Sequence, residues 1–261
     1  MVGDFWSRGW VKFPYDPVLA DWVEHALPAA QQSVRDPAFA EWLDCEGTWF
    51  VGVDALPNDT EGRVGNSAPL AGKAATFLQD HFGQLPLHRG QVSVIYPGYP
   101  RARRGESEAA ARYRRNRDAA HVDGLRPMGR DRRRRIDEPH AWILGIPLNE
   151  ASEDAAPLVV WDESHKAIGA AFRDALADHA GDVLHTVDIT DIYQATRRTV
   201  FETCTRIALP AKPGEAYLLH RHCLHGVAPW GDGASVGPDG RMIAYFRPEY
   251  PGGVAEWIES P

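Results

Sequence analysis

Histidines and an aspartate with metal-ligand spacing are the residues in this chain that could do chemistry. His121-Val122-Asp123 places an imidazole and a carboxylate two residues apart, and the segment His220-Arg-His-Cys-Leu-His225 supplies further imidazoles. Two imidazoles and one carboxylate hold Fe(II) on one face and leave the remaining positions open to reactants. The pattern indicates a mononuclear non-haem iron site, and the absence of a Cys-x-x-Cys motif argues against a structural zinc site.

The local geometry that these ligands need is that of a β-strand. Residues i and i+2 of a strand face the same side, so we expect His121 and Asp123 to point together into a barrel mouth. A histidine from a distant strand would complete the ligand face. Periodicity alone leaves His220, His222 and His225 open as the third ligand.

The elements around these residues predict a mainly β fold with flanking helices, of the jelly-roll type. We expect one domain over residues 1–261, with helical support in 1–90 and a catalytic core in 90–250 that carries a helical insertion around 150–200. Short alternating or apolar runs predict the strands, at residues 91–96, 141–146, 158–161, 205–209, 215–219 and 241–247. Amphipathic spacing predicts the helices, after Asp16-Pro17, over 68–82 and over 164–179.

Composition favours a globular cytoplasmic protein. The chain has 261 residues, 44% of them hydrophobic, which is enough for a sizeable core. It contains no apolar run of membrane-spanning length, and its start lacks the basic and apolar regions of a secretory signal. Three widely spaced cysteines suit a reducing compartment. We therefore expect no membrane association; the oligomeric state stays open.

The net charge of −8 conceals a strongly basic segment. Residues 101–135 hold 13 arginines, no lysine and only five acids, and they flank the proposed ligands His121 and Asp123. Guanidinium groups bind carboxylates and phosphates in a bidentate way. Two interpretations follow: a mobile lid that attracts an anionic substrate, or a solvated loop whose charges keep it soluble.

Longer strings in the second half resemble a known family. Lys212-Pro-Gly-Glu215 leads into a strand and then Leu224-His225-Gly-Val-Ala-Pro229, and Gly240-Arg241 opens the next strand. The segment 147–166 contains Pro157-Leu158 and Ser164-His-Lys166. In this order the strings resemble the phytanoyl-CoA dioxygenase family over residues 90–250. Asp162-Glu163 and Ala156 depart from the family pattern, where Pro-Gly and often Gly stand.

The resemblance implies a double-stranded β-helix (a cupin-like jelly roll) and an Fe(II)- and 2-oxoglutarate-dependent oxygenase, with O2 as the second cosubstrate. It implies that His121, Asp123 and His225 hold the metal and that Arg241 binds the C5 carboxylate of 2-oxoglutarate. Tyr96 lies on a strand that borders the cosubstrate in the family. Relatives that halogenate lack the carboxylate ligand, so Asp123 favours hydroxylation.

Arg247 shares a strand face with Arg241, and from this position we expect a second contact to the cosubstrate carboxylate or to an anionic substrate. A surface salt bridge near the strand end is the alternative. The predicted substrate is a small or medium anionic molecule.

Three other functions fit parts of the pattern. A non-catalytic jelly roll could bind a metal or an anion with the same residues. A nucleic-acid dealkylating dioxygenase is suggested by Arg241-x5-Arg247 and the arginine segment, but the net charge of −8 makes nucleic acid an unlikely partner. A zinc hydrolase could use the three ligands, and would leave Arg241 without a role.

Overall fold

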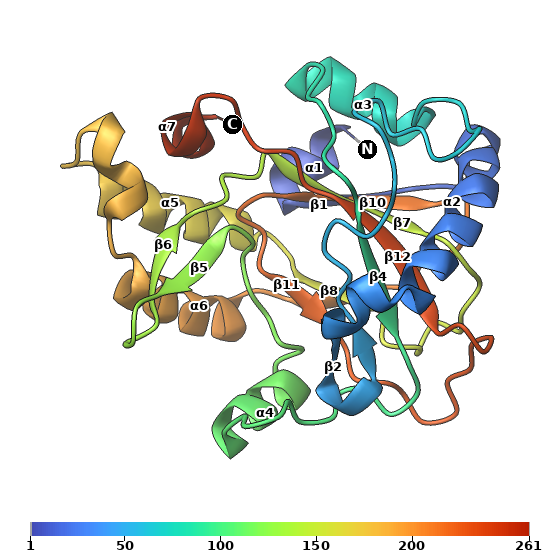
Figure 1. The fold of residues 1–261 in the computed structure, drawn as a ribbon. Helices are drawn as coiled ribbons and strands as arrows, with labels where there is room; N and C mark the ends of the chain where they lie inside the picture. The colour runs from blue at the N-terminus through green and yellow to red at the C-terminus, as the bar shows by residue number, and fades with distance from the viewer. Residues whose placement is uncertain (1, 261) are drawn as a thin grey trace.

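The computed structural model describes residues 2–260. Short 3-10 turns accompany the regular elements in this range (Figure 1). The α-helices are α1 (Val2–Arg8), α2 (Pro17–Arg35), α3 (Lys73–Phe82), α4 (Glu108–Asn116), α5 (Ser164–Leu176), α6 (Thr190–Thr203) and α7 (Gly253–Glu259). The strands are β1 (Trp10–Phe13), β2 (Leu43–Asp44), β3 (Trp49–Phe50), β4 (Gln91–Ile95), β5 (Leu125–Met128), β6 (Arg133–Ile136), β7 (Trp142–Pro147), β8 (Leu158–Trp161), β9 (Arg206–Leu209), β10 (Ala216–His220), β11 (His225–Val227) and β12 (Arg241–Phe246).

Two antiparallel sheets form the framework. The larger has seven strands in the order β1-β10-β7-β12-β4-β3-β2, and the smaller has the order β11-β8-β9. His121 adds an isolated antiparallel bridge to His225, at the β11 edge of the smaller sheet. A separate hairpin, β5-β6, follows the His121 segment (Figure 1). The observed fold is thus a mixed α/β arrangement whose sheets are antiparallel.

Strand alternation divides the larger sheet into two faces. β12 pairs with β4 so that Arg241, Ile243 and Tyr245 stand opposite Ile95, Ser93 and Gln91. Paired residues share a face, and successive residues alternate. Ile243 accordingly packs in the cluster between the sheets, whereas Met242 and Ala244 belong to the larger cluster under the helices. The inner face of β12 therefore carries both arginine positions predicted to bind carboxylates.

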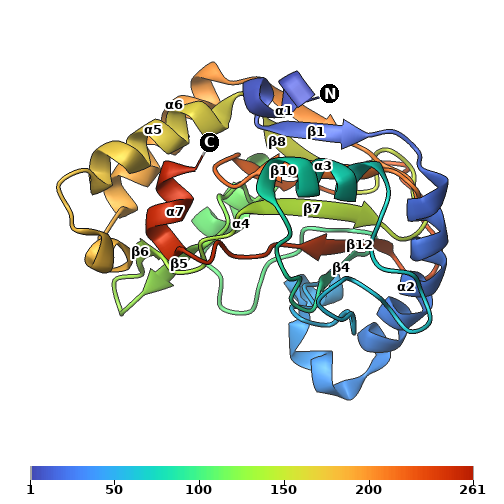
Figure 2. The same ribbon diagram turned by 90° about the horizontal axis from the view of Figure 1, so that it is seen from above.

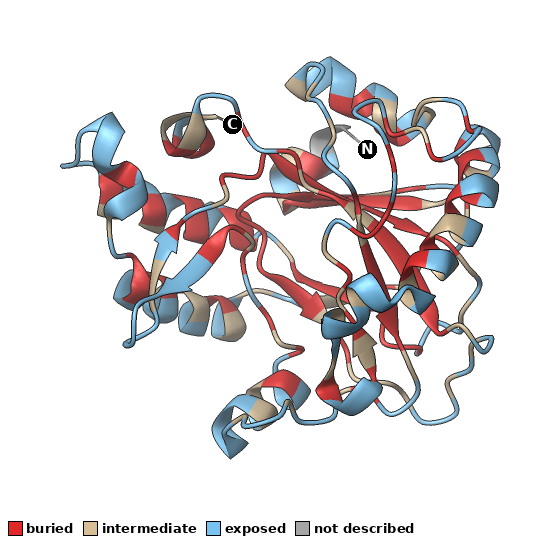
Figure 3. Cartoon of the chain, in the orientation of Figure 1, coloured by how far each residue is buried: buried red, intermediate tan, exposed pale blue. Residues whose placement is uncertain are grey.

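Helices cover the outer faces of the sheets. α3 lies over β7 and β10 in the view from above, and α5 runs beside α6 (Figure 2). Trp22 of α2 packs edge-on against Phe246 of β12, with ring centroids 6.0 Å apart. The strands in the centre are buried while the outward helix faces are exposed (Figure 3). No helix within residues 2–260 has the length and apolarity needed to span a bilayer.

The predicted helices are present, with one shifted start. α2 begins at Pro17, and the Asp16 side chain accepts a hydrogen bond from the backbone N–H of Val18, as expected of an N-cap. The helix predicted over 68–82 begins only at Lys73, because Gly72 adopts φ +99° and ends the irregular segment before it. Asp16 also accepts from the Lys73 N–H at 2.7 Å, so one carboxylate caps two helices.

The N-terminal ninety residues do more than provide helical support. β1 pairs with β10 at one edge of the larger sheet, and β2 and β3 extend the opposite edge beyond β4. These strands are two to four residues long, so their own alternation is too brief to identify them. Their place in the sheet is set by partners far away in the sequence.

Candidate metal centre

The three predicted ligands come together at the edge of the smaller sheet. His121 and His225 stand opposite each other in the isolated bridge, and their backbones exchange hydrogen bonds of 2.8 and 3.0 Å. Asp123 follows two residues later in a turn. Its Oδ1 lies 3.1 Å from His121 Nε2 and 3.7 Å from His225 Nε2. One ligand atom from each residue lies within 4.8 Å of the others, so the cluster can close around one ion.

Backbone carbonyls orient both imidazoles. His121 Nδ1 lies 3.0 Å from the carbonyl oxygen of Ala119, and His225 Nδ1 lies 2.9 Å from that of Cys223. A carbonyl can only accept, so each Nδ1 carries the proton and each Nε2 keeps a lone pair aimed at Asp123. This tautomer is the one a metal requires. Two neutral imidazoles and a carboxylate therefore fit a divalent first-row metal.

The charge of Asp123 is balanced inside the protein. Burial alone would raise the pKa of the Asp123 carboxyl, but the Arg247 guanidinium, the largest opposing influence, holds that pKa well below its usual range. Arg247 Nη1 donates to Asp123 Oδ2 at 3.2 Å. Burial lowers the pKa of His225 to about 4, in spite of the nearby carboxylate. The cluster is thus anionic at Asp123 and neutral at His225 near neutral pH.

A glycine and a partly buried ion pair hold the two ligand segments together. A Cβ on Gly226, directly after His225, would lie 2.2 Å from the carbonyl oxygen of Asp118, so only glycine allows this approach. Arg206 of β9 binds the Asp118 carboxylate through two hydrogen bonds of 2.7 and 2.8 Å. Tyr193 of α6 accepts a hydrogen bond from the Val122 N–H. The segment that leads to His121 is therefore anchored on three elements.

A cavity of about 190 Å³ opens in front of the cluster. Its walls combine the three ligands with side chains from the inner sheet faces and from the N-terminal edge strand. Its lining consists of Trp49, Val51, Val53, Gln91, Ser93, His121, Asp123, Ile143, Leu158, His225, Gly226, Val227, Tyr245 and Arg247. The sequence did not point to Trp49, Val51 and Val53, because nothing in residues 1–90 resembles a known motif.

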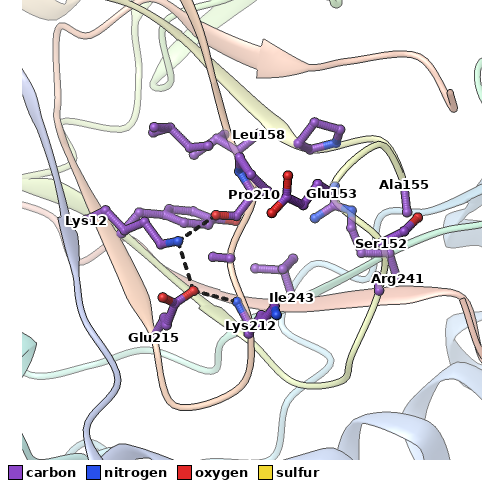
Figure 4. Close-up of a pocket in the computed structure, with 15 residues that line it drawn as sticks. Lys12, Ser152, Glu153, Ala155, Leu158, Pro210, Lys212, Glu215, Arg241 and Ile243 are labelled. Carbon is purple, nitrogen blue, oxygen red and sulfur yellow. Dashed lines mark hydrogen bonds and ion pairs between the residues drawn. The ribbon is translucent and has the colours of Figure 1, made fainter. Parts of the chain in front are cut away.

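Arg241 lines a second cavity, of about 250 Å³ (Figure 4). Leu158 is a lining residue of both cavities. Its side chain is 7% exposed, and its Nε has no hydrogen-bond partner among the described residues. Tyr217 lines this second cavity and Tyr245 the first, and their hydroxyls lie 2.9 Å apart. The two tyrosines thus stand between the triad and Arg241.

The other predicted residues lie away from the triad. Tyr96 contacts an outer groove formed with residues 34–50, because it follows the inward-facing Ile95 and so points to the other side of the sheet. Gln91, five residues earlier, lines the triad cavity instead. His220 and His222 are buried in a separate aromatic cluster with His165 and Trp257. Among the three candidate histidines, only His225 belongs to the metal cluster.

The arginines of residues 101–135 do not line the triad cavity. All 13 arginines lie within the described range, and none of them lines the triad cavity. Arg114 is buried in an ion pair with Glu106 at 2.6 Å. Other members pair with acids elsewhere: Arg103 with Asp44, Arg126 with Asp137, and Arg133 with Asp188 and Asp191. The expectation of an arginine lid over the site has no support in these contacts.

Arg247 does not form the surface salt bridge that was the alternative expectation for it. It lines the triad cavity and pairs with the buried Asp123 rather than with a surface acid. Strand periodicity predicted that Arg247 shares the inner face with Arg241. It could not predict that Arg247 pairs with Asp123.

Comparison with known proteins gives matches of fold only. No protein-family model and no curated protein matches the chain. Among solved structures, EvdMO1 is 12% identical and covers 96% of this chain and 49% of its own, with a TM-score of 0.51; the chain thus spans about half of that protein.

Two further matches are to structures of named enzymes. The epimerase SnoN in complex with Fe3+, alpha ketoglutarate and nogalamycin RO is 14% identical over 98% of this chain and 86% of its own, with a TM-score of 0.48. EctD from S. alaskensis with 2-oxoglutarate and 5-hydroxyectoine is 17% identical over 97% and 79%, with a TM-score of 0.44. SnoN is a non-haem alpha ketoglutarate dependent epimerase from nogalamycin biosynthesis.

Proposed function

We propose that this chain is an Fe(II)- and 2-oxoglutarate-dependent oxygenase that hydroxylates a small or medium-sized molecule. The observation that carries the proposal is the cluster of His121, Asp123 and His225, with both imidazoles fixed in the ligating tautomer by backbone carbonyls. A structural role for the cluster would not require an open cavity in front of it, and such a cavity is present.

The strand order supports a double-stranded β-helix as the scaffold. From β4 onward, the chain crosses repeatedly between the sheets: β4, β7, β10 and β12 lie in the larger sheet, and the His121 bridge, β8, β9 and β11 lie in the smaller, where β8 and β9 follow each other as an antiparallel pair. Their spatial orders are β10-β7-β12-β4 and His121-β11-β8-β9. This winding places His121 and His225 side by side at one end of the barrel.

We assign the C5 carboxylate of 2-oxoglutarate to Arg241. A buried guanidinium with an unused N–H is a strong carboxylate ligand. The cavities of Arg241 and of the triad share Leu158 as a lining residue, and the Tyr217 and Tyr245 hydroxyls link their walls. In the proposed complex the dicarboxylic acid extends from the metal ligands to Arg241 beside this tyrosine pair. Tyr96 has no part in this arrangement, because it faces the outer groove.

The residues of the chain divide the work as follows. His121, Asp123 and His225 would hold Fe(II), and the bound ion would supply O2 activation coupled to the oxidation of 2-oxoglutarate. Arg247 holds the Asp123 carboxylate in position. The apolar walls favour displacement of water from the reacting face when a substrate is bound, which would protect the reaction from unproductive oxidation. The intact carboxylate at Asp123 favours hydroxylation as the outcome.

Succinate formation tests the proposal without knowledge of the substrate. Protein supplied with Fe(II), 2-oxoglutarate and air should slowly convert 2-oxoglutarate to succinate, and His225→Ala should abolish this conversion. His25→Ala is the matched control, because His25 is exposed on α2. If the protein binds Fe(II) and 2-oxoglutarate and forms no succinate, it is a non-catalytic binding protein and the proposal is wrong.

A further inference from the structure

The wall that faces the metal ligands is apolar. Trp49 of β3 and the following Val51 and Val53 line one side of the triad cavity, and Ile143, Leu158 and Val227 line the sheet side. Trp49 pairs with Ile95 of β4, so both side chains lie on the inner face of the larger sheet, where the indole lines the cavity. The indole N–H donates to Ser93 Oγ at 3.1 Å, which fixes the orientation of the ring.

The cavity offers no free positive charge. Arg247 is the one lysine or arginine among its described lining residues, and its Nη1 already donates to the buried Asp123 carboxylate. The Nε of Arg247 has no hydrogen-bond partner among the described residues, but it belongs to the same guanidinium, so an anion bound there would place a second negative charge beside Asp123 with one cation for both. The arginines of residues 101–135 do not line the cavity. Charge complementarity therefore disfavours an anionic group at the reacting end of the substrate.

The remaining polar groups of the wall are neutral. Gln91 and Ser93 of β4 both line the cavity, and Ser93 already accepts from Trp49. The Gln91 amide can donate to or accept from a hydroxyl or carbonyl. A cavity of this kind, mostly apolar with one directing amide, selects by shape and by a single hydrogen bond.

We propose that the substrate presents an uncharged hydrocarbon surface, with a ring or branched chain, to the metal centre. The hydrocarbon packs against Trp49, Val51 and Val53, and a neutral oxygen on it bonds to Gln91. This inference rests on the proposed oxygenase function and replaces the anionic substrate expected from the arginine segment.

The test compares two probes of one ring system, 2-naphthol and 2-naphthoate, by calorimetric titration. The protein is loaded anaerobically with Fe(II) and saturating 2-oxoglutarate, and a parallel titration uses metal-free protein. We expect 2-naphthol to bind about tenfold or more tightly than 2-naphthoate, because the carboxylate would be desolvated without a partner. Equal or tighter binding of 2-naphthoate would overturn the inference.

A charge-introducing variant sharpens this comparison. Val53→Arg should reverse the preference toward 2-naphthoate, whereas Val18→Arg, at a 50% exposed position on α2, should leave it unchanged. If Val53→Arg does not fold, Val51→Ala serves instead: it should weaken 2-naphthol binding several-fold, because the ring loses apolar contact. If neither replacement of a wall residue changes the binding of 2-naphthol, the assigned wall is wrong.

The outcomes separate this inference from the oxygenase proposal. If the protein forms succinate and prefers 2-naphthoate, the oxygenase proposal stands and the inference of an uncharged substrate is wrong. If the protein forms no succinate and prefers 2-naphthol through contacts with Val51 and Val53, the apolar pocket is supported and the oxygenase proposal is wrong.

Discussion

At the scale of single residues, the site depends on side chains whose orientation is set by the backbone or by one charged partner. His121 and His225 each use Nδ1 on a carbonyl two residues earlier in the chain, so both rings turn the same nitrogen toward Asp123. Arg247 holds the other oxygen of that carboxylate. Such outer contacts fix ligand geometry before any metal binds.

Arg247→Gln should weaken Fe(II) binding by about tenfold, within the range known for lost outer contacts of metal ligands. The physical reason is that Asp123 loses the cation that holds its carboxylate. Anaerobic titration of Fe(II) measures the change. Arg35→Gln is the control, because Arg35 pairs with Asp239 on the surface. An unchanged Fe(II) affinity in Arg247→Gln would show that Asp123 does not depend on this partner.

Tyr245→Phe should raise the KM for 2-oxoglutarate by about tenfold, the effect of one lost hydrogen bond to a charged group, with a smaller change in kcat. The Tyr245 hydroxyl stands with that of Tyr217 between the triad cavity and Arg241. Steady-state kinetics of succinate formation provide the measurement. Tyr96→Phe should have no effect, and an equal rise in both variants would refute the assigned path of the cosubstrate.

The sequence predicted the residues of the site better than their contacts. Ligand spacing identified His121 and Asp123, although Asp123 lies in a turn and not on the strand expected to carry both. Strand alternation predicted the inward position of Arg247, and the family resemblance selected His225. The partnership of Arg247 with Asp123 joins residues 124 positions apart in the sequence, and no local pattern contains it. Tyr96 was misplaced because one residue changes the face of a strand.

At the scale of elements, close approaches decide which strands can pair. β7 is buried along its whole length, as its apolar sequence predicted. At its centre Gly145 stands between Tyr217 of β10 and Tyr245 of β12. A Cβ at Gly145 would lie 2.0 Å from the Tyr217 ring, so the glycine makes room for the tyrosine that lines the Arg241 cavity.

Gly145→Ala should therefore lower the free energy of unfolding by about 1–3 kcal/mol, as overpacking in a core does. It should also lower the affinity for 2-oxoglutarate, because Tyr217 must move. Gly181→Ala is the matched control, since a Cβ there meets nothing within 4 Å. Urea denaturation gives the stability, and equal stability of the two variants would contradict the packing described for β7.

Elements with several periods of their own pattern were predictable, and short edge elements were not. α2, β7 and β12 each contain enough alternation or helical spacing to be recognised. β2 and β3 have two residues each and exist because β4 offers an unpaired edge. The apolar wall of the triad cavity includes Trp49 of β3, and two-residue strands carry no pattern that could have predicted it.

At the scale of the whole molecule, the C-terminal segment is tied to the core through buried polar groups. Arg221 donates from Nε to the Trp257 carbonyl oxygen at 2.6 Å and also donates to the Ser260 carbonyl oxygen. His222 packs edge-on against Trp257, and its Nε2 has no hydrogen-bond partner among the described residues. Burial, with smaller contributions from His220 and Arg221, holds the pKa of His222 well below its usual range.

This burial makes stability fall at acid pH. The unfolded chain takes up a proton at His222 near pH 6.5, while the folded protein takes it up only at much lower pH. The contribution of His222 to the free energy of unfolding is complete above about pH 6.5. It decreases as the pH falls below this value, by up to ~1.4 kcal/mol per pH unit. His222→Gln should flatten the decrease between pH 7.5 and 5.5, measured by urea denaturation. His25→Gln should keep the wild-type slope; the same slope in both would disprove the assignment.

The central claim is that His121, Asp123 and His225 bind Fe(II) and that 2-oxoglutarate then chelates it. The most direct measurement is the visible absorption spectrum of the protein with Fe(II) and 2-oxoglutarate under anaerobic conditions. The account predicts a metal-to-ligand charge-transfer band that is lost in His225→Ala, weakened or shifted in Arg241→Ala and unchanged in His25→Ala. A folded, iron-loaded protein without this band, or a band that survives in His225→Ala, would contradict the account.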